Sequence, residues 1–388
     1  MAERSLIFAA REYRDRAARL QAGMDAQRLD ALLLTAPTDI FYTTGFLTRF
    51  WESPARPWFV VMPQAGDPVA VIPSIGAALM GRTWLRDIRT WDAPDPRDDG
   101  IGLLADTLAG AVPAGGRIGL PMGAETHLRM PLADFETLRA RLAPRPFVDA
   151  TACIQRVREV KSAAEIARIR ETCAIAGRAF ARVPEFAAEG RPLEKVFREF
   201  QIAALAEGAD WVSYVAGGAG PDGYGDVISP AGPQPLRRGD VLMLDTGAVK
   251  DGYFCDFDRN FAIGPASDAA RRAHHALWHA TEETLAALRP GLRACDVHGL
   301  LCAGLQARGA TPAGGRLGHG LGLSLTEWPS FTPHDDTPLR AGMVLTLEPG
   351  CITREGRIMV HEENIVLHED GAELLSPRAP AELPEIAG

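Results

Sequence analysis

The sequence predicts a two-domain α/β protein, with a mixed α/β domain over residues 1–155 followed by an α+β domain over residues 156–388. Two observations support this division. The chain of 388 residues exceeds the roughly 250 to 300 residues at which a single hydrophobic core stops growing. Strand-like runs alternate with helical patterns in the first part, whereas long helical patterns separate strand-like runs that carry carboxylates in the second. Apolar residues make up 46% and charged residues 23% of the chain, which is typical of a soluble globular protein.

The first domain begins with a helical pattern over residues 11–28. Short apolar runs follow it, each of a length and composition that predict a buried strand. These runs cover residues 31–35, 58–63, 69–73 and 117–120. No G-x-G-x-x-G follows the first of them, so the sequence gives no support for dinucleotide binding.

The second domain opens with Ser162 and, three residues later, Glu165, which together form a capping-box signature at the start of a helix. Apolar residues then recur at helical spacing. They are Ile166, Ile169, Cys173, Ala176 and Phe180. Pro192 fits the first turn of a helix that ends at Gly208. Two more helices are predicted over residues 268–288 and 295–308, and an Asp370–Gly371 turn links the last two predicted strands.

Five polar residues stand inside otherwise apolar segments of the second domain. They are Asp245, Asp256, His319, Glu348 and Glu362. A single carboxylate in a strand usually faces solvent, and a histidine between glycines is usually a loop residue. Here, however, four apolar residues precede Asp245, five residues that are mostly apolar precede Glu348, and an apolar run starts three residues after Glu362. Such strands are typically buried on both faces.

Buried carboxylates without partners cost several kcal/mol each, so these groups are expected to bind cations. Four carboxylates and one imidazole suit two divalent ions that share bridging carboxylates better than one zinc held by cysteine and histidine. Because side chains alternate along a strand, we expect Glu348 to share a face with Thr346, and Glu362 with Val360 and Asn364. The metal could be Mn, Fe, Co or Zn, since such a donor set does not discriminate among them.

In their order and flanking residues, these segments resemble the metallopeptidase superfamily that contains methionine aminopeptidase, aminopeptidase P, prolidase and creatinase. The matching motifs are Asp245-Thr246-Gly247, Gly252-Tyr253-x-x-Asp256-x-x-Arg259, Gly318-His319-Gly320-x-Gly322, Glu348-Pro349-Gly350 and Glu362. The resemblance covers nearly the whole chain. It implies a creatinase-like N-terminal domain and a C-terminal domain of pita-bread fold.

The resemblance also implies roles for the five residues. Asp245 would chelate one ion, His319 and Glu348 the other, and Asp256 and Glu362 would bridge the two. Glu348 and His319 are the expected catalytic residues, with Glu348 as the proton shuttle. The implied reaction is hydrolysis of an amide bond, as in an Xaa-Pro dipeptidase or aminopeptidase, with a dipeptide or a small modified amino acid as the substrate.

The chain departs from the family at two places that bear on substrate. Thr326 stands where these peptidases carry a further histidine, and residues 217–226 contain no histidine, which leaves Tyr224 or Asp226 as replacements. Arg259 is a further candidate for substrate binding. Trp51 lies in an aromatic segment, residues 49–58, that either packs on its own domain or shapes the active site of a partner in a homodimer. We therefore expect ordinary Xaa-Pro dipeptides to be poor substrates.

Three alternative functions remain open. A sulfoniopropionate-cleaving lyase uses the same fold, but carries an extra Asp where Gly247 stands. A metal-free creatinase-type hydrolase and a non-catalytic binding module would both be expected to lose ligands. All five candidate ligands are present.

The remaining composition limits partners and location. The net charge of -9 without a basic run argues against nucleic acid. No apolar run approaches the roughly 18 residues that span a bilayer. The N-terminal residues carry too many charges for a secretion signal, and the six cysteines are scattered, so a cytoplasmic location is expected.

Overall fold

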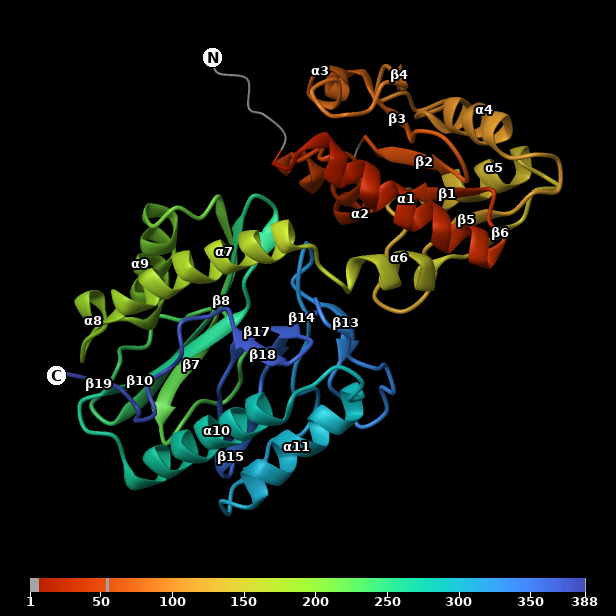
Figure 1. The fold of residues 1–388 in the computed structure, drawn as a ribbon. Coiled ribbons are helices and arrows are strands. Elements are labelled where there is room, and N and C mark those ends of the chain that lie inside the picture. Colours follow the sequence, from red (N-terminus) through yellow and green to blue (C-terminus); the bar gives the residue numbers. More distant parts are fainter. Residues whose placement is uncertain (1–6, 54–55, 388) are drawn as a thin grey trace. The chain divides into compact units, whose positions relative to one another are not determined.

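The structure, a computed structural model, describes residues 7–53 and 56–387. The chain divides into two compact units, Met1–Arg158 and Glu159–Gly388 (Figure 1). Each unit has its own sheets and its own buried apolar core. Two residues of the predicted aromatic segment, 54 and 55, lie outside the described residues.

The first unit is built around one mixed six-stranded sheet in the order β4-β3-β2-β1-β5-β6. Its strands are β1 (Ala31–Leu34), β2 (Phe59–Pro63), β3 (Val69–Pro73), β4 (Ile88–Trp91), β5 (Ile118–Leu120) and β6 (Phe147–Asp149). Its helices are α1 (Ala10–Gln27), α2 (Pro37–Thr44), η1 (Arg49–Glu52), η2 (Ser74–Gly76), α3 (Ala77–Met80), α4 (Ile101–Ala111), α5 (Leu132–Arg141) and α6 (Thr151–Arg158). The predicted helix and the four predicted strands are confirmed to within one residue at each end.

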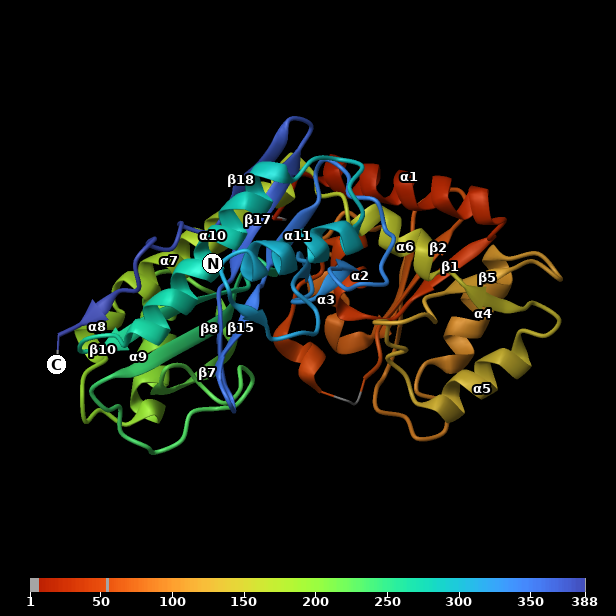
Figure 2. The same cartoon turned by 90° about the horizontal axis from the view of Figure 1, so that it is seen from below.

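The second unit contains three sheets with helices on both sides, as Figures 1 and 2 show. Strand orders are β19-β10-β8-β7 with β9 on β8, β13-β12-β14-β17-β18, and β11-β15-β16. The strands are β7 (Trp211–Pro221), β8 (Asp240–Lys250), β9 (Tyr253–Phe254), β10 (Phe257–Ile263), β11 (Thr311–Pro312), β12 (His319–Gly320), β13 (Glu327–Ser330), β14 (Val344–Leu347), β15 (Gly350–Arg354), β16 (Arg357–Val360), β17 (Glu363–His368), β18 (Gly371–Leu374) and β19 (Glu385–Ile386). The helices are α7 (Ala163–Ala181), α8 (Val183–Phe186), α9 (Leu193–Ala206), α10 (Asp268–Ala287) and α11 (Ala294–Gln306).

Helix α7 shows how the sequence determines this arrangement. The predicted capping box is present, because the Ser162 hydroxyl accepts from the Glu165 amide and the Glu165 carboxylate accepts from the Ser162 amide. This satisfies two amides that have no partner within the helix. The apolar face that follows, including Cys173 and Phe180, is buried, and α7 packs on β8. On the other side, α10 packs on β15 and β18.

The five candidate ligands lie at strands and at the breaks between them. Asp245 is inside β8 and His319 begins β12. Asp256 lies between β9 and β10, Glu348 directly follows β14, and Glu362 precedes β17. The expectation that Glu348 and Glu362 lie within strands is therefore wrong. Side chains alternate between the two faces only within a strand, so this alternation does not fix the directions of these two side chains.

Among the described helices, none combines the length and the apolar character that a membrane span requires.

Candidate metal centre

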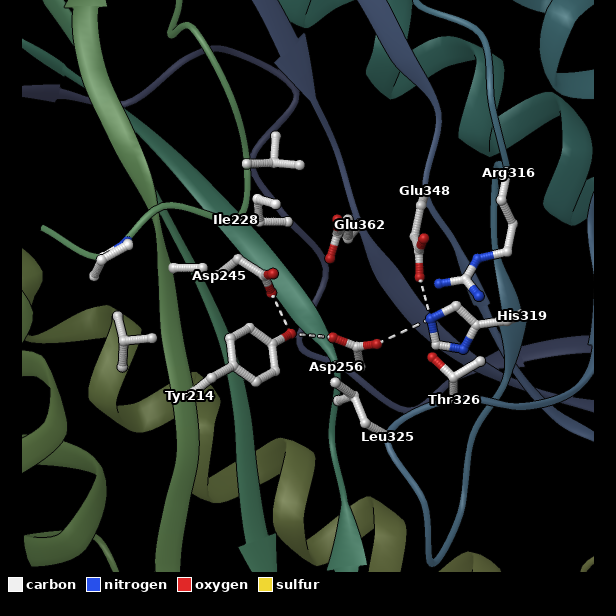
Figure 3. Close-up of a pocket in the computed structure, with 14 residues that line it drawn as sticks. Tyr214, Ile228, Asp245, Asp256, Arg316, His319, Leu325, Thr326, Glu348 and Glu362 are labelled. Carbon is white, nitrogen blue, oxygen red and sulfur yellow. Dashed lines mark hydrogen bonds and ion pairs between the residues drawn. The ribbon is translucent and has the colours of Figure 1, made fainter. Parts of the chain in front are cut away.

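The five candidate ligands converge on one cavity of about 550 Å³ in the second unit (Figure 3). The lining residues are Tyr214, Val215, Ala216, Val227, Ile228, Pro230, Asp245, Asp256, Arg316, His319, Leu325, Thr326, Glu348 and Glu362. This volume suits a small molecule of roughly dipeptide size. The acidic groups lie at its centre, between the apolar side chain of Ile228 and the guanidinium of Arg316.

The ligand atoms form two groups that share one residue. Asp256, His319 and Glu348 form the first, and Asp245, Asp256 and Glu362 form the second; within each group the ligand atoms lie within 4.8 Å of one another. Asp256 belongs to both, as a bridging ligand must. Glu362 belongs only to the second group, so the geometry supports a bridging role for Asp256 more directly than for Glu362.

His319 is oriented with its Nε2 atom toward the acidic residues. Its Nδ1 atom donates to the main-chain oxygen of Gly320 at 2.8 Å, and its Nε2 atom lies 3.1 Å from Asp256 Oδ2 and 2.9 Å from Glu348 Oε1. A carbonyl on Nδ1 leaves Nε2 as the ligand atom of a neutral imidazole. Thr346 supports both residues, since its hydroxyl donates to Glu348 Oε1 at 2.5 Å and accepts from the His319 amide at 2.9 Å.

The electrostatics of the group show an excess of buried negative charge. Burial, followed by repulsion from neighbouring carboxylates, raises the pKa of Asp245 and of Glu362 well above their ordinary values. Burial also raises the pKa of Asp256, although its hydrogen bond with His319 acts in the opposite direction. Burial alone would lower the pKa of His319, but Glu348 and Asp256 raise it to about 10. The site thus favours bound positive charge, which protons supply in part and divalent cations would supply fully.

The donor set fits two divalent ions. Four carboxylates would balance the four positive charges of two such ions, and oxygen with imidazole nitrogen is a donor set that suits Mn, Fe, Co or Zn. The residues that would hold one ion are Asp245, Asp256 and Glu362, and those that would hold the other are Asp256, His319 and Glu348.

Tyr214 is a site residue that the sequence analysis missed. Its hydroxyl lies 3.0 Å from Asp245 Oδ1 and is also hydrogen-bonded to Asp256 Oδ1. Burial and the adjacent carboxylates raise the pKa of Tyr214 well above its ordinary value, so the phenol stays protonated and can act as a donor. Tyr214 precedes Val215 and Ala216, whose partners on β8 are Thr246 and Asp245, so the pairing of β7 with β8 places it beside the ligands.

The lack of a side chain at Gly247 leaves room for the Tyr214 ring. A Cβ atom at position 247 would lie 2.4 Å from Tyr214 Cε1 and 3.1 Å from Leu325 Cδ1. The Tyr214 ring is held in this place by the hydrogen bonds of its hydroxyl to Asp245 and Asp256. A side chain at position 247 is therefore incompatible with this position of Tyr214.

The candidate substrate residues divide into one that lines the cavity and four that do not. Thr326 lines it, close to His319 (Figure 3). Tyr224 is instead fully buried in the core of the second unit, where its hydroxyl donates to Asn260 and accepts from the Val360 amide. Asp226 does not reach the cavity, because its carboxylate accepts from the amides of Ile228 and Ser229.

Arg259 and Trp51 also lie away from the cavity lining. The Arg259 guanidinium donates to Glu363 and to the main-chain oxygen of Glu362, behind the ligands. Trp51 belongs to the first unit, where its ring packs edge-on against Phe46 and Trp58. This is the packing on its own domain that the sequence analysis gave as one of two options.

Arg316 is the second residue that the sequence analysis missed. It is exposed, and among the described residues no carboxylate lies within ion-pair distance of it, although it lies on the same side of the cavity as Glu348. Arg316 stands three residues before His319 and two before the Gly-His-Gly motif. The motif itself therefore gives no indication of this arginine.

The chain matches two family models that together span most of its length. "Metallopeptidase family M24" matches residues 167–370. The chain belongs to this family. "Creatinase/Prolidase N-terminal domain" matches residues 16–160. This M24 protein is a metal-dependent hydrolase with the two-domain pita-bread architecture that its motifs predicted.

Relatives of this M24 protein are named as dipeptidases. It is 34% identical to "Probable dipeptidase PepE" of Mycobacterium tuberculosis, over 94% of each chain. It is 27% identical to the Xaa-Pro dipeptidase of Pyrococcus horikoshii, over 66% of this chain and 72% of that one. Among solved structures, dipeptidase PepE from Mycobacterium ulcerans superposes with a TM-score of 0.84 at 29% identity, over 98% of this chain and 100% of the other.

Proposed function

We propose that this M24 protein is a two-metal dipeptidase, which hydrolyses the amide bond of a dipeptide or of a similarly small modified amino acid. The observation that carries the proposal is the pair of ligand groups that share Asp256 inside a cavity of about 550 Å³. The names of its relatives, PepE dipeptidases and Xaa-Pro dipeptidases, support the same class of substrate.

When bound, the ions would polarise the scissile carbonyl as Lewis acids and would lower the pKa of water, so that hydroxide can attack this carbonyl near neutral pH. The protons that are transferred during hydrolysis would be held and moved by side chains of the protein itself. Glu348 carries a lowered pKa: burial opposes its ionisation, but His319 and the Thr346 hydroxyl outweigh burial. Glu348 is therefore ionised and can take up a proton at Oε2, since Oε1 is already held by Thr346.

The residues at two sides of the cavity support a dipeptide as the kind of molecule that it accepts. Arg316 is the one arginine or lysine among the described lining residues, and it faces the side of the site where Glu348 and His319 lie (Figure 3). It can receive the free carboxylate of a dipeptide. The apolar side chain of Ile228 lies on the opposite side (Figure 3) and can contact an apolar first residue; Val215 and Val227 also line the cavity.

The alternative of a lyase is not favoured. The additional Asp of that branch would occupy position 247, and the Tyr214 ring fills the space that its side chain would need. A non-catalytic binding module and a metal-free hydrolase are equally disfavoured, because the geometry of both ligand groups is preserved.

The proposal has three further parts. The first domain ends at residue 155 and the second begins at residue 156, the protein forms a homodimer, and it is located in the cytoplasm. The exposed ring of Phe50, next to Trp51, is an apolar surface in the first unit that a partner could cover.

The test is a comparison of dipeptides that begin with an apolar residue and carry either a free carboxylate or a carboxamide. Purified protein loaded with Mn²⁺ should cleave the free acids, with kcat/KM lower by roughly ten- to a hundredfold for the amides, since a charge-assisted hydrogen bond contributes about 1.5 to 3 kcal/mol. Arg316→Gln should remove this preference. The absence of any dipeptide hydrolysis in metal-loaded protein would reject the proposal.

A further inference from the structure

A second cavity of the same unit, of about 500 Å³, adjoins the cavity that contains the metal ligands. Val215 and Pro230 line both cavities. One wall of the second cavity is helix α9, which packs on β7, the strand of Val215. We call this cavity the α9 groove. The side chains of α9 that line it are Glu194, Phe197, Arg198, Gln201, Ile202 and Leu205.

The loop that carries Pro230 is held by hydrogen bonds on both sides of this residue. On one side, the Asp226 carboxylate accepts from the Ile228 amide at 3.0 Å. On the other side, the Gly232 oxygen accepts from the Glu194 amide at 3.0 Å. The second bond ties the loop to the start of α9 itself. The two walls of the α9 groove are therefore fixed relative to each other before any ligand binds.

Two large apolar side chains of α9 face solvent in this groove. Ile202 is 52% exposed and Leu205 is 49% exposed. Single exposed apolar residues are common on protein surfaces, but residues three apart lie on the same face of a helix. Here that face lines a hollow that adjoins the candidate metal centre. Apolar surface in such a place is typical of a ligand-binding groove.

The same groove carries polar groups that are available to a ligand. Among the described residues, neither Glu194 nor Arg198 has an ion-pair partner, and the Gln201 side chain makes no hydrogen bond. A plain alkyl chain would leave all three unused. An amino-acid residue instead presents a main-chain amide, which Gln201 and Arg198 can bind, and an amino-terminal ammonium, which Glu194 can bind.

The α9 groove lies toward the amino side of a dipeptide bound as proposed above. Arg316 would receive the free carboxylate, and Ile228, on the opposite side of the cavity, would contact the first residue (Figure 3). Pro230 stands two residues beyond Ile228 and is shared with the groove. Because the first cavity already suits a molecule of dipeptide size, the groove offers room for one more residue.

We propose that the α9 groove binds one additional apolar residue on the amino side, so that tripeptides with two apolar residues and a free carboxyl-terminal residue are also substrates. The inference rests on the proposed function and adds a substrate class to it. The chemistry is the same hydrolysis. Water adds to the carbonyl carbon of the second residue, the C–N bond to the third residue breaks, and the leaving amine takes up a proton. The products are an apolar dipeptide and a free amino acid.

The experiment compares Phe-Leu-Ala with Leu-Ala as substrates of the Mn²⁺-loaded protein, with initial products identified by mass spectrometry. Both peptides contain the same scissile bond and differ only in the residue that would occupy the groove. Ile202→Gln and Leu205→Gln remove apolar surface from the groove and keep a residue that favours a helix. Leu300→Gln is the matched control, because Leu300 is an exposed leucine on α11, away from both cavities.

We expect the wild-type protein to release free Ala and Phe-Leu from the tripeptide. Ile202→Gln and Leu205→Gln should each lower kcat/KM on Phe-Leu-Ala by roughly 10-fold, the usual effect of a lost apolar contact in a binding pocket, and leave kcat/KM on Leu-Ala unchanged. Leu300→Gln should change neither value. Glu194→Gln should lower kcat/KM on Phe-Leu-Ala but not on N-acetyl-Phe-Leu-Ala, which has no ammonium.

Three results would overturn the inference and leave the proposed function intact. They are hydrolysis of Leu-Ala without hydrolysis of Phe-Leu-Ala, initial release of Phe and Leu-Ala from the tripeptide, and equal kcat/KM on the tripeptide in the α9 variants and the wild type. A preference for the N-acetylated peptide that Glu194→Gln does not alter would assign the groove to an acyl group instead of a residue, and would also overturn it. Failure of the wild-type protein to hydrolyse Leu-Ala would reject the proposed function itself.

Discussion

The Lys161 ammonium lies 3.0 Å from Glu327 Oε2, and the two side chains are only 1% and 2% exposed. The other oxygen of Glu327 accepts from the amides of Leu323 and Ser324. This carboxylate therefore fixes the loop that brings Leu325 and Thr326 to the cavity. A residue in front of α7 thus supports the shape of a site that it does not touch.

Lys161→Met should lower the free energy of unfolding by about 3 to 5 kcal/mol, because it removes the ammonium from a buried ion pair with Glu327. Urea denaturation of the purified protein measures this change. Lys195→Met, at an exposed position on α9, is the matched control and should change stability by less than about 0.5 kcal/mol. Equal stabilities of the two variants would show that the buried pair does not support the fold.

Asp256→Asn should abolish binding of both ions and all hydrolysis, since Asp256 is the residue common to the two ligand groups. Glu362→Gln should lose one ion, because Glu362 belongs to one group only. Elemental analysis after gel filtration gives the number of ions per chain. Asp106→Asn, at an exposed position on α4, should retain the wild-type content, and two ions retained in Asp256→Asn would contradict the assignment.

Xaa-Pro dipeptides should be poor substrates of the wild-type protein, because Thr326, which lines the cavity, stands where the resemblance to these peptidases implies a further histidine. A preorganised donor contributes roughly 100- to 1000-fold to turnover. We expect Thr326→His to increase kcat/KM on Xaa-Pro dipeptides, and Thr326→Val, which adds no donor, to leave it low. A wild-type kcat/KM on these dipeptides of about 10⁴ M⁻¹s⁻¹ or more would disprove the importance of the missing histidine.

Thiol reagents should modify at most two of the six cysteines in the native protein, Cys295 and Cys302, which are partly exposed. Burial raises the pKa of Cys153 to about 11 and that of Cys351 to about 12. At pH 8 these thiols are both inaccessible and protonated, and the thiolate is the reactive form. Mass spectrometry after maleimide treatment counts the adducts, with urea-unfolded protein as the reference for all six. Native modification of Cys153 would contradict the buried position on α6.

The metal ligands could be predicted from the sequence because their flanks are apolar. A carboxylate that follows four buried residues, as Asp245 does, has little chance of reaching solvent, and its charge must be compensated locally. The same argument applies to Glu348. The fold and the ligands could therefore be predicted from local patterns and from the motifs that resemble the family.

The residues around the ligands could not be predicted in this way. Residues 217–226 were expected to contact the substrate through Tyr224 or Asp226, but Gly217 to Pro221 belong to β7, and at Gly217 a Cβ atom would lie 2.3 Å from the Met243 oxygen. Tyr224 then turns into the core and forms a bridge with Ile358. Tyr214 reaches the ligands because the register of β7 against β8 shifts between Val212 and Val215. A bulge of this kind redirects a side chain and leaves no clear trace in the pattern of residues.

The close fit of Gly247 against Tyr214 constrains how descendants of this chain can change their chemistry. A third acidic residue on β8, two positions beyond Asp245, is only one substitution away in the sequence, yet the Tyr214 ring occupies the space that it needs. The order of mutations therefore matters. Tyr214 must first be exchanged for a smaller residue. This exchange removes the hydroxyl that is hydrogen-bonded to Asp245 and Asp256. A lineage that acquires the new carboxylate therefore passes through an intermediate with a weakened metal site.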